Sequence, residues 1–211
     1  PRSGSSGRFS SPFPGRGFCG SASPTPADAL ARALRFGRLP MRLTRVGLTG
    51  ASGVVGRALL RICGERGIAV AATSRRRPAV LPAGSSWAPW DLREERGPGA
   101  LDALFPGVDA LLHAGARVPR PGEAPTSDRE FIEANVRPCG DLGRWAAARG
   151  LPIVFLSSSV VYADPEREGI REDDPKGFSG LGGFYGSSKV RAEEVFEACA
   201  EEGLRLVRRR P

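Results

Sequence analysis

A glycine-rich loop between a β-like run and a helical run constrains this chain more than any other feature. The β-like run covers residues 44–49, continues into Gly50-Ala51-Ser52-Gly53-Val54-Val55-Gly56, and gives way to a helical pattern up to Glu65. In this context the first glycine permits a tight turn, the second lets the backbone approach a pyrophosphate, and the third lets the helix pack on the strand. The helix N-terminus offers N–H groups and a positive dipole end to phosphate. We therefore predict a dinucleotide-binding loop with contacts from Gly50, Ser52, Gly53, Val54, Val55 and Gly56.

The rest of the chain alternates between β-like and helical runs. We expect further strands at 68–73, weakly near Trp87, and at 108–113, 152–158 and 204–207, and helices at 131–149 and 185–202. Strands that alternate with helices form βαβ units, whose crossover helices cover both faces of a parallel sheet. The predicted fold class is therefore α/β, a doubly wound parallel sheet of the Rossmann type.

The end of the second predicted strand indicates which nicotinamide cofactor the loop prefers. An NAD-selective site usually has an acidic residue here, which holds the ribose diol. This chain has Ser74 followed by three arginines, of which Arg75 comes first, and these groups suit a 2′-phosphate. We predict an NAD(P) cofactor, with NADP preferred over NAD. The alternative is that the arginines only form a solvated loop.

A tyrosine and a lysine stand four residues apart in a chain that has only two of each. Tyr185 and Lys189 would lie on one face of a helix, where an ammonium can lower the pKa of a neighbouring phenol. Three serines, Ser157 to Ser159, end the fifth predicted strand and would point into the ligand crevice, where a hydroxyl can polarise a substrate oxygen. The alternative is a polar strand end satisfied by the backbone.

Taken in this order, the segments from Met41 to Pro211 resemble the NAD-dependent epimerase/dehydratase family, the extended branch of the short-chain dehydrogenases/reductases. The loop resembles the family's TGxxGxxG, and Tyr185 and Lys189 match its YxxxK pair. The resemblance implies Ser158, Tyr185 and Lys189 as catalytic residues, with Ser157 and Ser159 as alternative registers. It also implies cofactor contacts from Asp91, Leu92, Ala114, Gly115, Ala116, Asn135, Tyr185 and Lys189.

The resemblance implies an enzyme in which the tyrosine exchanges a proton, the lysine lowers its pKa and binds the nicotinamide ribose, and the serine polarises the oxygen. The acidic segment 172–175 is similar to the loop that precedes the tyrosine in nucleotide-sugar enzymes, so a nucleotide sugar is the expected substrate. The alternatives are an NADP-dependent reductase of a ketone or steroid-like substrate, and a non-catalytic NADP-binding sensor or inactive fragment. His113, Trp87 and Trp90 are interpreted as packing residues. A homodimer through the helix at 185–202 is also considered.

Composition limits the classes of partner. The formal net charge is +8, but residues 1–40 hold six arginines against one acid and residues 208–210 are three more arginines, so the body is near neutral. No basic stripe interleaved with aromatic residues remains, and we predict no nucleic-acid partner. No run of 18 apolar residues occurs, which predicts no membrane partner.

The cysteines and the single histidine predict neither disulfides nor a metal site. Cys19, Cys63, Cys139 and Cys199 lie far apart and form no CxxC or Cys/His ligand spacing. Reduced thiols are therefore expected, and with them a cytoplasmic location.

Two segments are expected from the overall organisation. Residues 1–40 are rich in Gly, Ser, Pro and Arg, which predicts a disordered leader or an upstream translation artefact before Met41; an organelle transit peptide is the rival interpretation. Residues 41–211 form the predicted NAD(P)-binding domain. By its resemblance this domain lacks further strands and a substrate domain, so we expect a C-terminally truncated chain.

Overall fold

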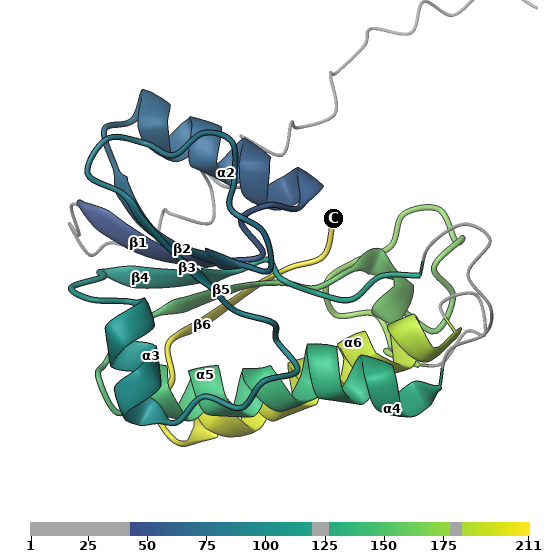
Figure 1. Cartoon of the computed structure of the whole chain (residues 1–211). Helices are drawn as coiled ribbons and strands as arrows, with labels where there is room; N and C mark the ends of the chain where they lie inside the picture. Colours follow the sequence, from purple (N-terminus) through teal and green to yellow (C-terminus); the bar gives the residue numbers. More distant parts are fainter. Residues whose placement is uncertain (1–42, 120–126, 178–182) are drawn as a thin grey trace, which may run out of the picture.

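The computed structural model describes residues 43–119, 127–177 and 183–211, and the expectations for residues 1–40 lie outside this part of the chain. Six parallel strands form one sheet in the order β3-β2-β1-β4-β5-β6 (Figure 1). Their bounds are β1 Arg45–Thr49, β2 Ala69–Ser74, β3 Ser86–Pro89, β4 Ala110–His113, β5 Ile153–Leu156 and β6 Leu206–Arg209. The order reverses between β1 and β4, the switch point at which ligands bind in open α/β sheets. The predicted fold class is confirmed.

Helices cover both faces of the sheet, with α2 on one face and α3, α5 and α6 on the other (Figure 1). Their bounds are α2 Val54–Glu65, α3 Pro98–Leu104, α4 Asp128–Phe131, α5 Arg137–Ala147 and α6 Gly183–Glu201. A π-helical segment, η1 Ile132–Val136, joins α4 to α5, and a short 3-10 turn, η2 Ser159–Val161, follows β5.

Each face of the sheet has its own apolar core because successive strand residues point to opposite sides. In β4, Ala110 and Leu112 pack with the residues of α2, whereas Leu111 packs with those of α3, α5 and α6. The α2 side is built on Leu59, Leu60, Ile62 and Cys63. Val55, at the start of the same helix, is 37% exposed and lies outside this core.

Three elements differ from the sequence prediction. Helix α3 was missed, although Pro98 at its start and Leu101 on its buried face are helix signals. The predicted helix at 131–149 begins earlier and is interrupted by η1, a local irregularity that periodicity does not reveal. Strand β5 ends at Leu156, so the serines follow the strand and do not belong to it.

Within the described ranges, the helices are all too short or too polar to cross a membrane.

Candidate active site

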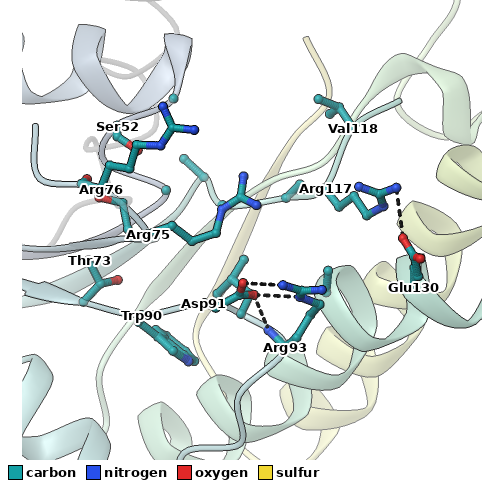
Figure 2. Close-up of a pocket in the computed structure, with 18 residues that line it drawn as sticks. Ser52, Thr73, Arg75, Arg76, Trp90, Asp91, Arg93, Arg117, Val118 and Glu130 are labelled. Carbon is teal, nitrogen blue, oxygen red and sulfur yellow. Dashed lines mark hydrogen bonds and ion pairs between the residues drawn. The ribbon is translucent and has the colours of Figure 1, made fainter. Parts of the chain in front are cut away.

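A cavity of about 400 Å³ opens at the carboxyl ends of β1, β2, β3 and β4. Figure 2 shows charged side chains from these strand ends around it, together with Glu130 of α4. Ten of the predicted cofactor contacts line it: Gly50, Ser52, Gly53, Ser74, Arg75, Asp91, Leu92, Ala114, Gly115 and Ala116. A cavity of this size, at the switch point of the sheet, is within the range of small-molecule sites.

The glycine loop has the geometry that a close backbone approach requires. Gly50 has φ 71°, and a Cβ there would lie 2.5 Å from Gly115 Cα. A Cβ on Gly56 would lie 2.2 Å from the Gly50 carbonyl oxygen, so only glycine lets α2 start this close to the loop. A Cβ on Gly53 would meet only that oxygen, at 3.2 Å, so packing within the protein requires glycine less strictly at this position. The loop therefore fits a pyrophosphate laid over Gly53, below the N-terminus of α2.

Three predicted loop contacts do not line the cavity. Gly56 is buried beneath the loop, and the Val54 and Val55 side chains are 79% and 37% exposed. These residues can reach a phosphate only through the backbone N–H groups of the first helical turn, which lack intrahelical partners in any helix. No acidic residue occupies this first turn.

The end of β2 differs in detail from the predicted 2′-phosphate site. The Ser74 hydroxyl donates to the Arg76 carbonyl oxygen at 2.7 Å and accepts from Trp87 Nε1 at 3.1 Å, so its donor is already used. Arg75 and Arg76 are exposed and line the cavity, while Arg77 does not. The cations for a phosphate are therefore present, and the hydroxyl instead fixes the turn after β2.

Asp91 lies at the same end of the cavity, paired with an arginine that we had not predicted. Arg93 donates to both of its carboxylate oxygens, through Nε at 3.1 Å and Nη2 at 2.8 Å (Figure 2). These hydrogen bonds, with a smaller contribution from the charge of Arg75, lower the pKa of Asp91 to about 2. Asp91 is therefore ionised at any physiological pH.

A hydrogen-bonded chain fixes the segment after β4. The Gly115 N–H donates to Thr49 Oγ1 at 3.1 Å, and that hydroxyl is 2.7 Å from His113 Nδ1. Burial, together with the nearby Lys189 charge, lowers the pKa of His113 to about 3, so the ring is neutral and shares one hydrogen bond with the Thr49 hydroxyl. Nε2 faces Cys139 Sγ at 3.7 Å. The structure places His113 in the core beside the cavity, as the packing interpretation predicts.

Asn135 lies in η1 and does not reach the cavity. Its Oδ1 accepts from the Arg117 N–H at 2.7 Å, and its Nδ2 donates to the Arg117 carbonyl oxygen at 3.0 Å and to Ser188 Oγ at 2.9 Å. The side chain thus joins the segment after β4 to α6 and has little hydrogen-bonding capacity left for a cofactor.

The predicted acid–base residues meet beyond the end of β5. The Ser158 hydroxyl lies beside the Tyr185 phenol, and the Lys189 ammonium donates to the Leu156 carbonyl oxygen at 2.7 Å. The ammonium also lies 4.4 Å from the centre of the Phe155 ring. None of Ser158, Tyr185 and Lys189 lines the cavity itself.

The pKa values of Tyr185 and Lys189 differ from the expectation that the lysine lowers the pKa of the phenol. Burial raises the pKa of Tyr185, and the Ser158 hydroxyl offsets this only in part. Burial also lowers the pKa of Lys189 to about 8. The expectation that Lys189 lowers the pKa of the phenol is wrong for this structure, because the lysine is directed at the β5 carbonyl.

A ring contact connects this group to the cavity. Phe131 of α4 and Tyr185 of α6 have ring centres 6.5 Å apart at an angle of 63°. Glu130, next to Phe131, and Ala134, one turn later, both line the cavity. Tyr185 therefore lies just behind the wall of the cavity.

Sequence reasoning missed several lining residues, namely Thr73, Trp90, Arg93, Arg117, Val118, Glu130 and Ala134, whereas Arg76 is one of the three arginines expected at a 2′-phosphate. Thr73 and Trp90 lie at the ends of β2 and β3, and Arg93, Arg117 and Val118 lie in the segments that follow β3 and β4, so their position relative to the strand ends was the available signal. Trp90 was assigned to packing, and it is 2% exposed with its ring 6.4 Å from Phe105, so it serves the core as well as the wall. Among the described residues, no group of three or more His, Cys, Asp or Glu is arranged to hold a metal ion.

Comparison with known proteins agrees with this geometry. A family model described as the NAD dependent epimerase/dehydratase family matches residues 46–211. The uncharacterized protein YbjS of Escherichia coli (strain K12) is 29% identical over 163 residues, which cover 74% of this chain and 46% of YbjS.

Two solved structures show the same fold. A short-chain dehydrogenase/reductase superfamily protein from Agrobacterium tumefaciens, with bound NAD, has a TM-score of 0.66 and 28% identity over 79% of this chain and 48% of its own. MoeE5 in complex with UDP-glucose and NAD has a TM-score of 0.61 and 29% identity, covering 78% and 52%. The chain thus spans about half the length of these relatives.

Proposed function

Since this chain belongs to the NAD dependent epimerase/dehydratase family, we propose that it binds a nicotinamide dinucleotide in the cavity and acts on a nucleotide sugar. The observation that carries the proposal is the arrangement at the switch point. The glycine cradle opens to the cavity, and Tyr185 of α6 lies behind its wall through contact with Phe131. When bound, the dinucleotide would supply the hydride donor or acceptor, a chemistry that belongs to the cofactor.

The residues of the chain would bind the pyrophosphate, transfer the proton and polarise the substrate oxygen. The loop at Gly50–Gly53 and the first turn of α2 hold the pyrophosphate through backbone N–H groups. Tyr185 gives or takes the proton at its phenolic oxygen, and Ser158 donates to the substrate oxygen. Because burial raises the pKa of Tyr185, the phenol is protonated at neutral pH and is ready to act first as an acid.

The nucleotide sugar is the substrate class we favour. MoeE5, 29% identical, is described in complex with UDP-glucose as well as NAD. The matched family is named for NAD dependent epimerases and dehydratases. The activity and substrate of the whole protein belong to this proposal, since the chain spans about half of its relatives.

A Tyr185→Phe variant tests the acid–base assignment. It should lose at least about 100-fold in turnover of a UDP-sugar while it keeps its affinity for the dinucleotide, because only the proton donor is removed. Tyr162→Phe is the matched control, since Tyr162 is the other tyrosine of the chain and its hydroxyl accepts from Arg210 at 2.9 Å. Unchanged turnover in Tyr185→Phe would remove the catalytic assignment. A protein that binds the dinucleotide and turns over no sugar would favour the sensor alternative.

The preference for NADP is the finer part of the proposal. Arg75 and Arg76 face the cavity without an acidic residue at the end of β2, which favours a 2′-phosphate, although both relatives named above carry NAD. The same arginines favour the second candidate, an NADP-dependent reductase of a ketone or steroid-like substrate. Fluorescence titration should show tighter binding of NADPH than of NADH.

Matched arginine variants sharpen that titration. Arg75→Ser should weaken NADPH binding by about 10-fold and leave NADH binding unchanged, since it removes one charge-assisted contact to phosphate. Arg77→Ser, two residues further along the chain and outside the cavity lining, should change neither affinity. If NADH binds the unmodified chain at least as tightly as NADPH, the preference is refuted.

Two further parts of the proposal concern the state of the protein. We propose a homodimer through residues 185–202, which sedimentation equilibrium checks. We also propose a cytoplasmic location, which imaging of the tagged full-length protein checks.

A further inference from the structure

Helix α6 carries a third buried polar side chain in line with its tyrosine and lysine. Tyr185, Lys189 and Glu193 are spaced by four residues, which places them one above the other on one face. Glu193 is 0% exposed and Lys189 is 2% exposed. Buried carboxylates are rare unless they are paired and hydrogen-bonded, so the contacts of Glu193 need an explanation.

Glu193 is held by the end of β6. Arg210 donates to it through Nε at 2.8 Å and Nη2 at 2.6 Å, the two-pronged geometry in which a guanidinium binds a carboxylate most strongly. Lys176 Nζ and Arg208 Nη1 lie further away, at 3.5 and 3.8 Å. Burial alone would raise the pKa of Glu193, but Arg210 foremost, with smaller effects from the Ser157 hydroxyl and the Lys176 charge, outweighs it and lowers the pKa, so the group is ionised.

The same carboxylate adjoins the end of β5. The buried Ser157 hydroxyl lies close enough to Glu193 to lower its pKa, although it makes no hydrogen bond of ordinary geometry. Lys189 binds the carbonyl of Leu156, the residue before Ser157. Lys189 and Glu193 therefore converge from one helix face on adjacent residues of one strand end, and Ser158 follows directly.

The surroundings of the Lys189 ammonium contain few charges. His113 of β4 is neutral, and burial raises the pKa of the Cys139 thiol of α5 to about 12, so it is neutral as well. The Tyr185 phenol is protonated at neutral pH because its pKa is raised. Burial is the main influence on the pKa of Lys189; of the two groups that oppose it, Cys139 and Glu193, only Glu193 is charged near neutrality.

We propose that Glu193 is a positioning residue of the proposed active site: its buried carboxylate, held by Arg210, supplies the negative charge that stabilises the Lys189 ammonium. The Glu193–Arg210 ion pair also links α6 to the end of β6, and the hydrogen bond from Lys189 to the Leu156 carbonyl links α6 to the end of β5, just before the serines. A buried ion pair is by itself weak evidence for stability, since apolar pairs replace such pairs at little cost, and this favours a functional reason for its presence. The inference deepens the proposed function, because it assigns a partner to Lys189.

The scarcity of lysine gives a direct test, because Lys176 and Lys189 are the two lysines of the chain. Lysine labelled with ¹³C at Cε and ¹⁵N at Nζ gives two NMR signals in the full chain without added ligand, and Lys176→Arg assigns them by removing one. In the unmodified chain Lys189 should titrate with a pKa of about 8. In Glu193→Gln this pKa should fall by about one pH unit, the effect of losing one charge from the adjacent turn of the same helix in a partly screened interior.

Glu197→Gln is the matched control. Glu197 lies one turn further along α6, is 39% exposed and binds Lys176 at 3.0 Å and Arg208. Its loss should move the Lys176 signal and leave the Lys189 titration unchanged. Equal shifts of Lys189 in both variants, or no shift in Glu193→Gln, would overturn the proposal.

Arg210→Gln carries the test if Glu193→Gln does not fold. It leaves Glu193 with Lys176 and Arg208 as partners, so the carboxylate stays compensated. Because Arg210 is the cation that binds Glu193 most closely, its removal leaves more of the carboxylate's charge to act on Lys189. The Lys189 pKa should then rise, and an unchanged value would overturn the proposal. These titrations need no turnover, so their failure is distinct from failure of the proposed function. If turnover is found, Glu193→Gln should shift the alkaline limb of its pH profile with Lys189, which a purely structural role would not do.

Discussion

The clash at Gly56 gives the sharpest test of the loop geometry. In Gly56→Ala the new Cβ would lie 2.2 Å from the Gly50 carbonyl oxygen and 2.7 Å from Ala51 Cα, where ordinary contacts begin at 3.4 Å. Both neighbours are backbone, so no side chain can rotate away. Helix α2 must then move off the loop by roughly 1 Å.

The expected loss of stability follows from the gap that this displacement opens between α2 and the sheet. A gap of that size forfeits about a quarter to a half of the dispersion attraction across the interface. The side chains affected are Leu59, Leu60, Ile62 and Cys63, which pack α2 on the sheet. We expect a loss of about 3 kcal/mol in the free energy of unfolding, the upper end for overpacking, and a Tm lower by roughly 6 to 12 °C.

Gly64→Ala is the matched control on the same helix. A Cβ there would meet only Pro82, at 3.7 Å or beyond, so the change adds helix propensity without a clash. It should raise the free energy of unfolding by about 0.5–1 kcal/mol. Urea unfolding followed by circular dichroism compares the two variants, and NADH titration should show at least about 10-fold weaker binding for Gly56→Ala, because the pyrophosphate cradle moves. Equal stability of Gly56→Ala and the unmodified chain would refute the packing argument.

Further predictions concern single contacts. Asp91 has a lowered pKa in the folded chain, so the stability that its ionisation contributes is present above pH 4 and is lost as the pH falls towards 2. In Arg93→Gln, NMR titration should find the Asp91 pKa higher than in the unmodified chain. An unchanged pKa would contradict the pairing of Asp91 with Arg93. A Cβ on Gly143 would lie 2.5 Å from Cys199 Sγ, so Gly143→Ala should destabilise the chain by about 1–3 kcal/mol. Adding Cys199→Ala should recover part of that loss. If the two substitutions instead have additive effects on the free energy of urea unfolding, the contact is refuted. Thr49→Val leaves two buried partners of the hydroxyl unsatisfied and should cost about 2 kcal/mol, while Thr49→Ser should be close to neutral; equal losses would show that the methyl group matters more.

Much of the fold could be predicted because its signals are local. The spacing of apolar residues along 54–65 and the glycines at the start of that helix depend only on neighbours in the sequence, and the structure has α2 with the predicted bounds. Helix α3 escaped prediction because it is short, and the π-helical segment because apolar spacing does not reveal such an irregularity; its Asn135 side chain bonds to Arg117 and Ser188, which are distant in the sequence.

The candidate site divides in the same way. The sequence by itself determined the parallel α/β sheet, the glycine loop over its switch point, and the shared helix face of Tyr185 and Lys189, since each follows from backbone geometry over a few residues. Only the tertiary structure decided that Arg93 pairs with the Asp91 carboxylate, that Lys189 donates to the Leu156 carbonyl, and that Arg210 binds the Glu193 carboxylate. The first depends on how the chain turns after β3, and the other two join residues that lie in different parts of the fold. Burial then sets the pKa values, and burial exists only once the helices are packed on the sheet.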